Sequence, residues 1–257
     1  SLPFSKVDMT YSLILSSNNT LINKKFSASH VKGKTECTDL VIYGSNLSST
    51  LKYPGFSSKL RAVCQIPAHL NSIILGILLS DGWLYKNKSS KTLLALKQSI
   101  KNFGYLWFVY TKLSHYCRSL PRVTTSNLNG NKKYGVVFAT RVYPCFTEWY
   151  NIFYVDGKKR VPLDLYNMLT YEALAHWIMG DGTKSCKGLT LQTQSFSIQE
   201  CVFIISILIH KFNLKCNIHM QRNQPTIYIS AKSMKRLKPK ILPYMCPSMK
   251  YKLGGFE

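Results

Sequence analysis

The stretch "ILGILLSDG" at residues 74–82 decides how the chain folds. From Pro67 onward, apolar residues follow helical spacing and also occupy the other side, so we expect a helix buried nearly all round. Gly76 in its middle costs about 1 kcal/mol of helix propensity, which close approach of another backbone would offset. The helix is predicted to end at Asp81-Gly82, because glycine is the usual residue just past a helix end.

A second stretch, "LAHWIMGDG" at residues 174–182, repeats this pattern 100 residues later and again ends in Asp-Gly. The order helix, strand, strand, helix, strand, strand, helix is written twice along the chain. It predicts an α+β fold of two pseudo-symmetric αββαββα half domains with antiparallel sheets. The other expected elements are helices at 105–120, 144–153, 197–212 and from about 232, and strands at 83–85, 92–99, 121–126, 134–142, 189–196, 215–221 and 225–230.

The charge of the chain indicates its partners. It has 34 basic and 11 acidic residues, a net charge of +23. Nucleic acid is the leading candidate, because cations released from neutralised phosphates supply affinity that does not depend on sequence. No apolar run approaches the roughly 20 residues of a membrane span, so no membrane partner is expected. The eight cysteines form no CxxC pair, which argues against structural zinc and favours a reducing compartment.

The two Asp-Gly pairs are more than turn signals, although a single pair would mark only a helix stop. Each carboxylate follows the negative end of a helix dipole, where an anion is disfavoured by about 0.3–1 kcal/mol. If the two apolar helices pack on each other, Asp81 and Asp181 meet, and their repulsion calls for cations. Divalent metal fits this need, since carboxylates bind Mg²⁺ and two-metal sites hydrolyse phosphodiesters.

Both stretches resemble the LAGLIDADG motif, and two copies are typical of the single-chain class of LAGLIDADG homing endonucleases. The second half, from "LTYEALAHWIMGDGT" to "PSMKYKL", is similar to the mitochondrial intron-encoded group of that family. The resemblance covers about residues 67–253, and residues 1–65 have no counterpart in it. We therefore expect a partly ordered extension at 1–65, half domains at 66–154 and 169–257, and a linker at 155–168.

The resemblance implies that the two motif helices form the central interface and that the two sheets form a saddle over a long asymmetric DNA target. Asp81 and Asp181 would bind Mg²⁺ or Mn²⁺, and Ca²⁺ would bind without supporting cleavage. The backbone carbonyls of Ser80 and Gly180 are further candidate ligands. Cleavage in the family leaves 3′ overhangs.

Two lysines complete the implied centres. The segments "KKRVP" (158–162) and "KYKL" (250–253) match family segments that carry a lysine near each centre. The match implies that Lys159 and Lys252 polarise water or stabilise phosphate charge in catalysis, with ordinary phosphate contact as the alternative. His176, one turn before Asp181, is expected to pack in the interface and not to bind metal.

Alternating polar residues on the predicted strands are candidates for DNA contact, because polar side chains on one sheet face suit base edges and phosphates. The alternative for each is a solvated sheet face. The candidates are Lys97, Gln98, Arg122, Lys132, Lys133, Arg141, Lys184, Thr190, Gln192, Gln194, Lys215, Asn217, His219, Gln221, Arg222 and Tyr228.

Three functions stay open at this point. The leading one is a DNA endonuclease of intron mobility, acting as a monomer on double-stranded DNA. A maturase on the same fold, which helps intron RNA to splice, is the main alternative, and a protein with both activities is compatible with both aspartates. A non-catalytic DNA-binding module is the third. Seven arginines against 27 lysines fit an AT-rich genome, and the resemblance then favours a fungal mitochondrion.

Overall fold

The computed structural model describes residues 42–43, 51–128, 130–185 and 188–254. Most of the predicted 1–65 extension lies outside these residues. All elements below belong to one compact unit, residues 40–257. The first half domain consists of α3 (Ala68–Leu79), β3 (Gly82–Lys86), β4 (Thr92–Ser99), α4 (Phe103–Leu113), β5 (Arg122–Leu128), β6 (Asn131–Ala139) and α5 (Pro144–Phe153).

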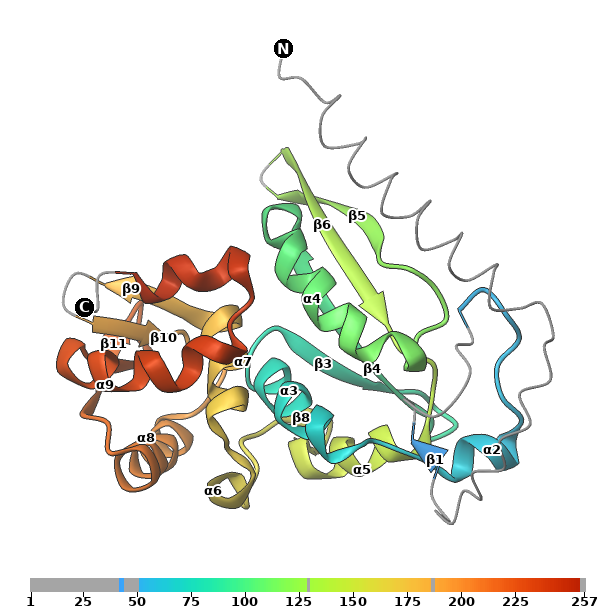
Figure 1. Cartoon of the computed structure of the whole chain (residues 1–257), viewed down its shortest axis with the longest axis horizontal. Coiled ribbons are helices and arrows are strands. Elements are labelled where there is room, and N and C mark those ends of the chain that lie inside the picture. The colour runs from blue at the N-terminus through green and yellow to red at the C-terminus, as the bar shows by residue number, and fades with distance from the viewer. Residues whose placement is uncertain (1–41, 44–50, 129, 186–187, 255–257) are drawn as a thin grey trace, which may run out of the picture. The chain divides into compact units, whose positions relative to one another are not determined.

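The second half domain repeats this order (Figure 1). Its sheet has the strand order β9-β10-β12-β11, which matches β3-β4-β6-β5 in the first half, and every pairing in both sheets is antiparallel. The predicted α+β architecture is confirmed. The elements are α7 (Tyr171–Asp181), β9 (Gly182–Ser185), β10 (Gly188–Leu191), α8 (Ile198–Phe212), β11 (Cys216–Gln221), β12 (Gln224–Ser230) and α9 (Ala231–Ile241).

Helices α3 and α7 cross at the centre of the molecule and join the two halves (Figure 1). At Gly76 an added Cβ would lie 2.4 Å from the carbonyl oxygen of Ala173, and at Gly180 one would lie 2.4 Å from Oγ of Ser80. A side chain at position 76 would therefore meet the backbone of α7, and one at position 180 would meet the side chain of Ser80. The close approach expected at Gly76 is present.

The helix ends have local causes. In α7 the hydroxyl of Thr170 caps the first turn by accepting a hydrogen bond from the Ala173 amide, at 3.1 Å. In α8 Ser197 and Glu200 form a capping box, and Asn213 ends the helix in the left-handed region with φ of 53°. Among the described residues, no helix combines the length and apolarity that crossing a bilayer needs.

Two elements are shorter in the structure than the sequence predicts. The helix expected at 105–120 ends at Leu113 and tightens into a 3-10 turn at Ser114–Tyr116. The strand expected at 189–196 ends at Leu191. There the Gln192 amide donates to the Asp181 carbonyl, and the Thr193 hydroxyl donates to the Pro225 carbonyl, so tertiary contacts end the ladder.

Short elements complete the unit. Part of the predicted extension packs on the first half domain, where the Tyr116 hydroxyl donates to the Gln65 carbonyl at 2.7 Å. The predicted linker begins with a hairpin that pairs Tyr154 with Lys159. These elements are β1 (Ile42–Tyr43), which runs parallel to β2 (Cys64–Gln65), α2 (Ser58–Ala62), β7 (Tyr154–Val155), β8 (Lys158–Lys159), α6 (Leu165–Met168) and the 3-10 turns Ile100–Asn102, Leu242–Tyr244 and Pro247–Leu253.

Candidate metal centre and nucleic-acid interface

The crossing of α3 and α7 brings Asp81 and Asp181 together. Asp181 is the last residue of α7, and Asp81 follows Ser80, which ends α3. A Cβ on Gly180 would lie only 3.4 Å from Oδ2 of Asp81, so the second motif reaches the first carboxylate. The predicted meeting of the two motif ends at one place is present in the structure.

Lys159 covers the end of α3. Its Nζ donates to the carbonyls of Ser80 at 3.1 Å and Gly82 at 2.9 Å. Burial lowers the pKa of Lys159 to about 8, although Asp181 and Asp81 act in the opposite direction. Lys159 lies in the segment predicted to be a linker, 155–168, yet its ammonium group lies at the end of the first motif helix.

Lys252 does the same for α7. Its Nζ donates to the carbonyls of Ile178, Met179 and Gly180 at 3.3, 2.6 and 2.8 Å, and the side chain is 8% exposed. Burial lowers the pKa of Lys252, and the two aspartates oppose that shift. Each motif helix therefore ends against a lysine, half-buried at α3 and buried at α7, whose charge stabilises the negative end of the helix dipole.

The lysines do not fully compensate the carboxylate of Asp181. Burial, and after it the charge of Asp81, raise the pKa of Asp181 to about 7, although Lys159 and Lys252 act in the opposite direction. A divalent cation between the carboxylates would remove both causes, so the donor set fits a hard metal with oxygen ligands. Among the described residues no group of three His, Cys, Asp or Glu side chains could hold a metal, which leaves two carboxylates and backbone carbonyls.

Gln98 lies in the centre as well. Its Nε2 donates to Oδ2 of Asp81 at 2.6 Å, and Asn102 donates to its Oε1 at 3.1 Å. Only 7% of Gln98 is exposed, so this arrangement does not present its side chain to bases. The strand pattern predicts Gln98 as a DNA contact, which would require it to be accessible. In the described part of the chain, the Asp181 carboxylate has no equivalent side-chain donor.

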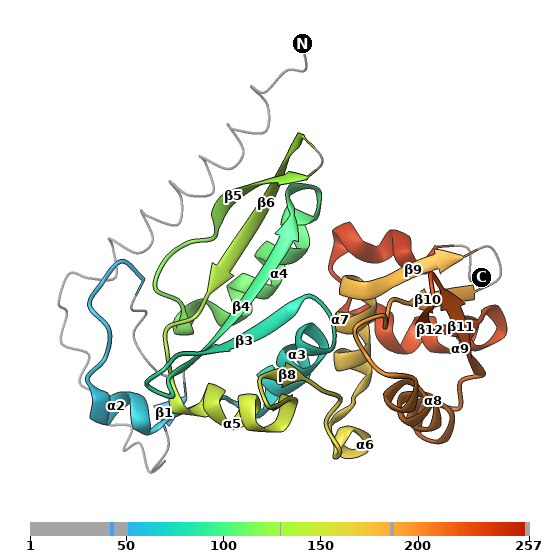
Figure 2. The same cartoon turned by 180° about the vertical axis from the view of Figure 1, so that it is seen from behind.

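The four strands of the second sheet are seen in Figure 2, and the burial of their residues gives the sheet one polar and one apolar face. Directly paired residues share a face, which joins Asn217, Tyr228, Thr190 and Thr183 in one row. The row Cys216, Ile229, Leu189 faces the helices and is buried. Thr190 is itself only 6% exposed between its neighbours, so Asn217 and Tyr228 are the more accessible of the predicted contacts in this row.

Several other predicted contacts in the second half have partners of their own. Lys184 pairs with Leu189 and so starts on the helix side of the edge strand β9. Gln194 donates to Gln192, which donates to Thr183, and both glutamines lie past the end of β10. His219 stacks on Tyr228 with ring centroids 4.7 Å apart.

The remaining candidates of the second half lie at the margins of β11. Gln221 pairs with Gln224, and this leaves Arg222 and Asn223 as a two-residue turn with φ of 50° and 60°. Arg222 is exposed at that turn, and Lys215 is exposed just before the strand. Both therefore keep a position from which a phosphate could be contacted.

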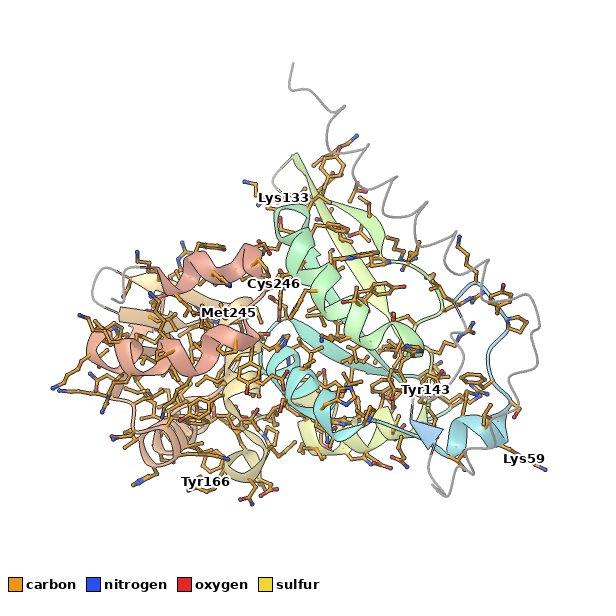
Figure 3. All side chains as sticks on the ribbon, in the orientation of Figure 1. Lys59, Lys133, Tyr143, Tyr166, Met245 and Cys246 are labelled. Atoms are coloured by element: carbon orange, nitrogen blue, oxygen red, sulfur yellow. The ribbon has the colours of Figure 1, made fainter. Side chains whose placement is uncertain are left out.

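In the first half, Lys97, Val137 and Arg122 form one row across β4, β6 and β5, and both basic residues are exposed. Lys133 lies near the end of the β5–β6 hairpin (Figure 3). Because successive strand residues point to opposite faces, Lys132 and Lys133 cannot share a face.

Arg141 is placed away from both sheets. It follows β6, and its guanidinium donates to the Tyr53 carbonyl on the N-terminal side of α2. An added Cβ on Gly55 would lie 2.9 Å from this guanidinium, so the side chain packs against that segment. The assignment of Arg141 to DNA contact is not supported by this position, which the strand pattern alone could not reveal.

His176 packs in the helix interface, as expected. It is 1% exposed, its ring stacks on Phe108, and its backbone carbonyl accepts from the Tyr105 hydroxyl at 3.2 Å. Burial lowers the pKa of His176 to about 3. The ring is therefore neutral and structural.

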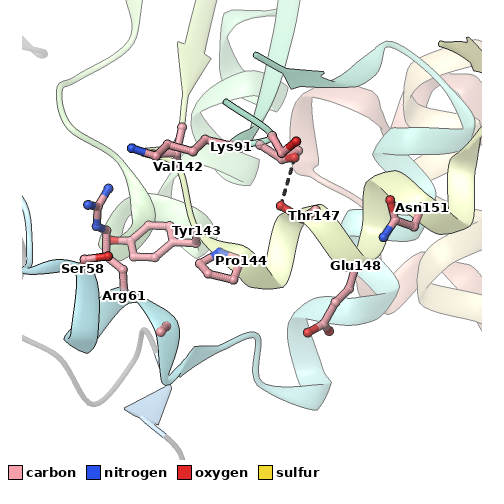
Figure 4. Close-up of a pocket in the computed structure, with 12 residues that line it drawn as sticks. Ser58, Arg61, Lys91, Val142, Tyr143, Pro144, Thr147, Glu148 and Asn151 are labelled. Carbon is pink, nitrogen blue, oxygen red and sulfur yellow. Dashed lines mark hydrogen bonds between the residues drawn. The ribbon is translucent and has the colours of Figure 1, made fainter. Parts of the chain in front are cut away.

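A cavity of about 460 Å³ lies outside this centre, between α2 and the start of α5 (Figure 4). Arg61, Lys91, Tyr143 and Glu148 are among its lining residues, and Thr147 and Thr92 are hydrogen-bonded at 3.0 Å within it. Neither aspartate and neither lysine of the helix ends lines it. The cavity is separate from the candidate metal centre.

Fold and site together define a class: single-chain proteins with two motif helices crossing between pseudo-symmetric halves, and an aspartate at each helix end. The profile of the LAGLIDADG DNA endonuclease family matches residues 71–237. The chain belongs to this family.

Individual relatives agree with this assignment. The chain is 36% identical over 191 residues to cytochrome b mRNA maturase bI2 of Debaryomyces hansenii, covering 72% of this chain and 73% of the relative. It is 36% identical to the Saccharomyces cerevisiae protein of the same name, but spans 49% of that protein's length and 74% of its own. A probable intron-encoded endonuclease of Wickerhamomyces canadensis is 33% identical, with 70% of this chain and 81% of that protein covered.

A solved structure supports the fold. It is that of the homing endonuclease I-WcaI bound to its DNA recognition sequence, with a TM-score of 0.70 at 31% identity. The match covers 74% of this chain and 87% of the other. The match extends over parts of both half domains, because neither half domain alone makes up 74% of the chain.

Proposed function

We propose that this protein is a site-specific homing endonuclease that makes a double-strand break in a long asymmetric DNA target. The observation that carries the proposal is the pair Asp81 and Asp181, held at one place by two crossing helices whose last carbonyls each accept hydrogen bonds from a lysine. A helix seam needs no carboxylate, and repulsion between two of them opposes folding, so a role in binding cations explains both.

Residues on the two sheets would bind the DNA, and residues at the helix ends would cut it. The exposed rows that include Lys97 and Arg122 on one sheet and Asn217 and Tyr228 on the other would bind phosphates and base edges in the major groove. This binding would hold one scissile phosphate at each carboxylate. Two cuts staggered across the minor groove between the sheets' contacts would leave the 3′ overhangs of the family.

The carboxylates of Asp81 and Asp181 would hold Mg²⁺ or Mn²⁺. When bound, such an ion polarises a phosphodiester and lowers the pKa of a water ligand. Ca²⁺ would occupy the site and permit DNA binding without cutting. Lys159 and Lys252 would keep the helix ends neutral and present a proton beside the phosphate, and the lowered pKa of each favours giving it up.

A maturase function is the second candidate. Two relatives at 36% identity carry the name cytochrome b mRNA maturase, so assistance to intron RNA splicing could accompany or replace cleavage. Both aspartates are compatible with either case. The same names and the lysine-rich composition support a mitochondrial location, and the pseudo-symmetric pair of halves supports action as a monomer.

The test is cleavage of DNA that carries the uninterrupted insertion site of the intron. Wild type is incubated with Mg²⁺, Mn²⁺ or Ca²⁺ beside Asp81→Asn and Asp181→Asn, and the two strands are labelled with different dyes. We expect wild type to cut both strands in Mg²⁺ or Mn²⁺ and each variant to lose at least one cut. Failure of wild type to cut, or full cutting by both variants, would overturn the nuclease proposal.

A further inference from the structure

Helix α9 carries an unusual concentration of positive charge. Five of its eleven residues are basic, and the apolar face formed by Met234, Leu237 and Ile241 is buried against the rest of the half domain. Apart from Ala231 and Pro239, every position outside the buried face is basic. The cations are Lys232, Lys235, Arg236, Lys238 and Lys240, of which all but the half-buried Lys238 are exposed.

No acidic side chain among the described residues pairs with this face. Lys232, Arg236 and Lys240 follow one another at i, i+4 spacing on one ridge, an arrangement of like charges that destabilises a helix. The ion pair between Arg160 and Glu200 is the one salt bridge in the described part of the chain, and it lies elsewhere. Within that part, no ion pair therefore offsets the repulsion among these cations.

The fold does not require these cations. Helix α5 holds the same place in the first half domain, after the fourth strand of its sheet. It also buries an apolar face, with Cys145, Phe146 and Trp149, but it contains no Lys or Arg and one acid, Glu148. Two helices in equivalent positions therefore differ by six charges, from −1 to +5.

The charged face is remote from the proposed DNA saddle. Helix α9 packs on β10 and β12 from the side of the buried residues Leu189 and Ile229 (Figures 1 and 2). The row of Thr190 and Tyr228, proposed for DNA, faces the other side of the same sheet. A duplex held in the saddle would leave the outer face of α9 free.

We propose that the outer face of α9 is a second nucleic-acid surface, which binds the phosphate backbone of structured RNA. The proposal rests on the charge complementarity between the row of basic residues on α9 and a polyanion. The choice of RNA rests on the maturase function proposed above. Because the two surfaces lie on opposite sides of one sheet, the protein can hold RNA and its DNA target together.

The test compares two triple variants of equal net charge. Lys232→Gln, Lys235→Gln and Lys238→Gln together remove three α9 cations that make no hydrogen bond to the described residues. Arg236 and Lys240 stay, since they donate to the Asn213 carbonyl and the Tyr171 hydroxyl. The matched control carries Lys59→Gln, Lys101→Gln and Lys112→Gln, exposed positions outside both strand rows. Either variant lowers the net charge from +23 to +20.

The RNA probe is a transcript of the intron that encodes the chain, with an unrelated transcript of equal length beside it. For the α9 variant we expect intron RNA binding to weaken about tenfold or more at 100 mM salt, and the salt slope to fall by about 2. The control variant should bind RNA as wild type does. With DNA target bound in Ca²⁺, wild type should still take up RNA as a ternary complex.

Three results would overturn the inference: absence of RNA binding by wild type, release of RNA by the DNA target, or equal loss in both variants. Binding of α9 to vesicles with about 20% anionic lipid, with RNA binding unchanged in the variant, would assign the face to a membrane and also overturn it. DNA cleavage by the α9 variant should stay within about twofold of wild type. If wild type binds RNA through α9 but never cuts DNA, the nuclease proposal fails and this one stands.

Discussion

The two half domains place the same pair of groups, an aspartate and a lysine, at the end of each motif helix, but they surround them differently. In the first, Gln98 donates to Asp81, and the Ser80 hydroxyl donates to the Gly76 carbonyl at 3.1 Å. In the second, Asp181 has no such donor among the described residues, and glycine replaces the serine. The two halves therefore share the geometry of the helix ends and differ in the support around each carboxylate.

Substitution of Lys252 or Lys159 should have the largest effect on the difference between the two centres. Lys252→Met should slow the cut at the second centre by about 10²–10³, because a buried cation beside the phosphate is lost, and leave the first cut active. Lys159→Met should do the reverse. Rates for each strand are measured on doubly labelled target.

The exposed neighbours Lys250 and Lys158 supply controls, since Lys250→Met and Lys158→Met remove a charge without touching a helix end. If Lys252→Met and Lys159→Met slow both strands equally, the centres do not act separately.

Substitutions at the glycines between α3 and α7 test whether Gly180 is needed because serine occupies position 80. Gly180→Ala should destabilise the protein by about 2 kcal/mol, because its Cβ would meet the side chain of Ser80. Adding Ser80→Gly removes that obstacle and should restore much of the loss. Gly76→Ala should cost about 3 kcal/mol, and no side-chain change should rescue it, because the Ala173 backbone is the obstacle. Urea unfolding of Gly180→Ala, Ser80→Gly, their double variant and Gly76→Ala measures this, and additive losses in the double variant would contradict it.

His176 holds the place in α7 that Gly76 holds in α3, and it makes the seam sensitive to acid. Its pKa is about 3 in the fold, below the ordinary 6.5, so the stability it contributes is full above pH 6.5 and falls as pH drops. At pH 5 the loss should be about 2 kcal/mol. His176→Phe should remove this dependence and keep the stacking on Phe108.

Unfolding at pH 7 and pH 5 without metal checks the prediction for His176. The raised pKa of Asp181 acts in the opposite direction, since its stability is lost as pH rises towards 7, but it does so in both proteins and cancels from their difference. An equal pH dependence in wild type and variant would show that another group is responsible.

Gln98 gives the smallest expected effect. Gln98→Leu removes the donor to Asp81 and should slow the first cut about tenfold, or about 1.4 kcal/mol, while the second cut is unchanged. Asn102→Ala, which removes only the partner of Gln98, should have a weaker effect in the same direction. Equal slowing of both strands would mean that Gln98 acts through DNA binding instead.

The sequence alone predicted the motif helices, the repeat and the meeting of the aspartates, because helical periodicity and the Asp-Gly stops are local signals. It missed what depends on tertiary contacts. The donor role of Gln98 arises because the end of α3 lies beside β4, and a strand pattern does not show which neighbour stands at a strand's end. The packing of Arg141 against Tyr53 and the end of β10 at Leu191 could not be predicted for the same reason, since Tyr53 is distant in sequence from Arg141 and Pro225 is distant from Thr193.

The positions of the two lysines along the chain have a consequence for synthesis. Lys159 follows the first half domain directly, so it is synthesised before α7. Lys252 lies in the 3-10 turn Pro247–Leu253, after every helix and strand of the second half domain, so the end of α7 stays uncovered until that whole half domain has been made. A premature stop or a proteolytic cut in this turn would therefore remove one lysine and spare the other. Such a molecule should break one strand and leave the other intact.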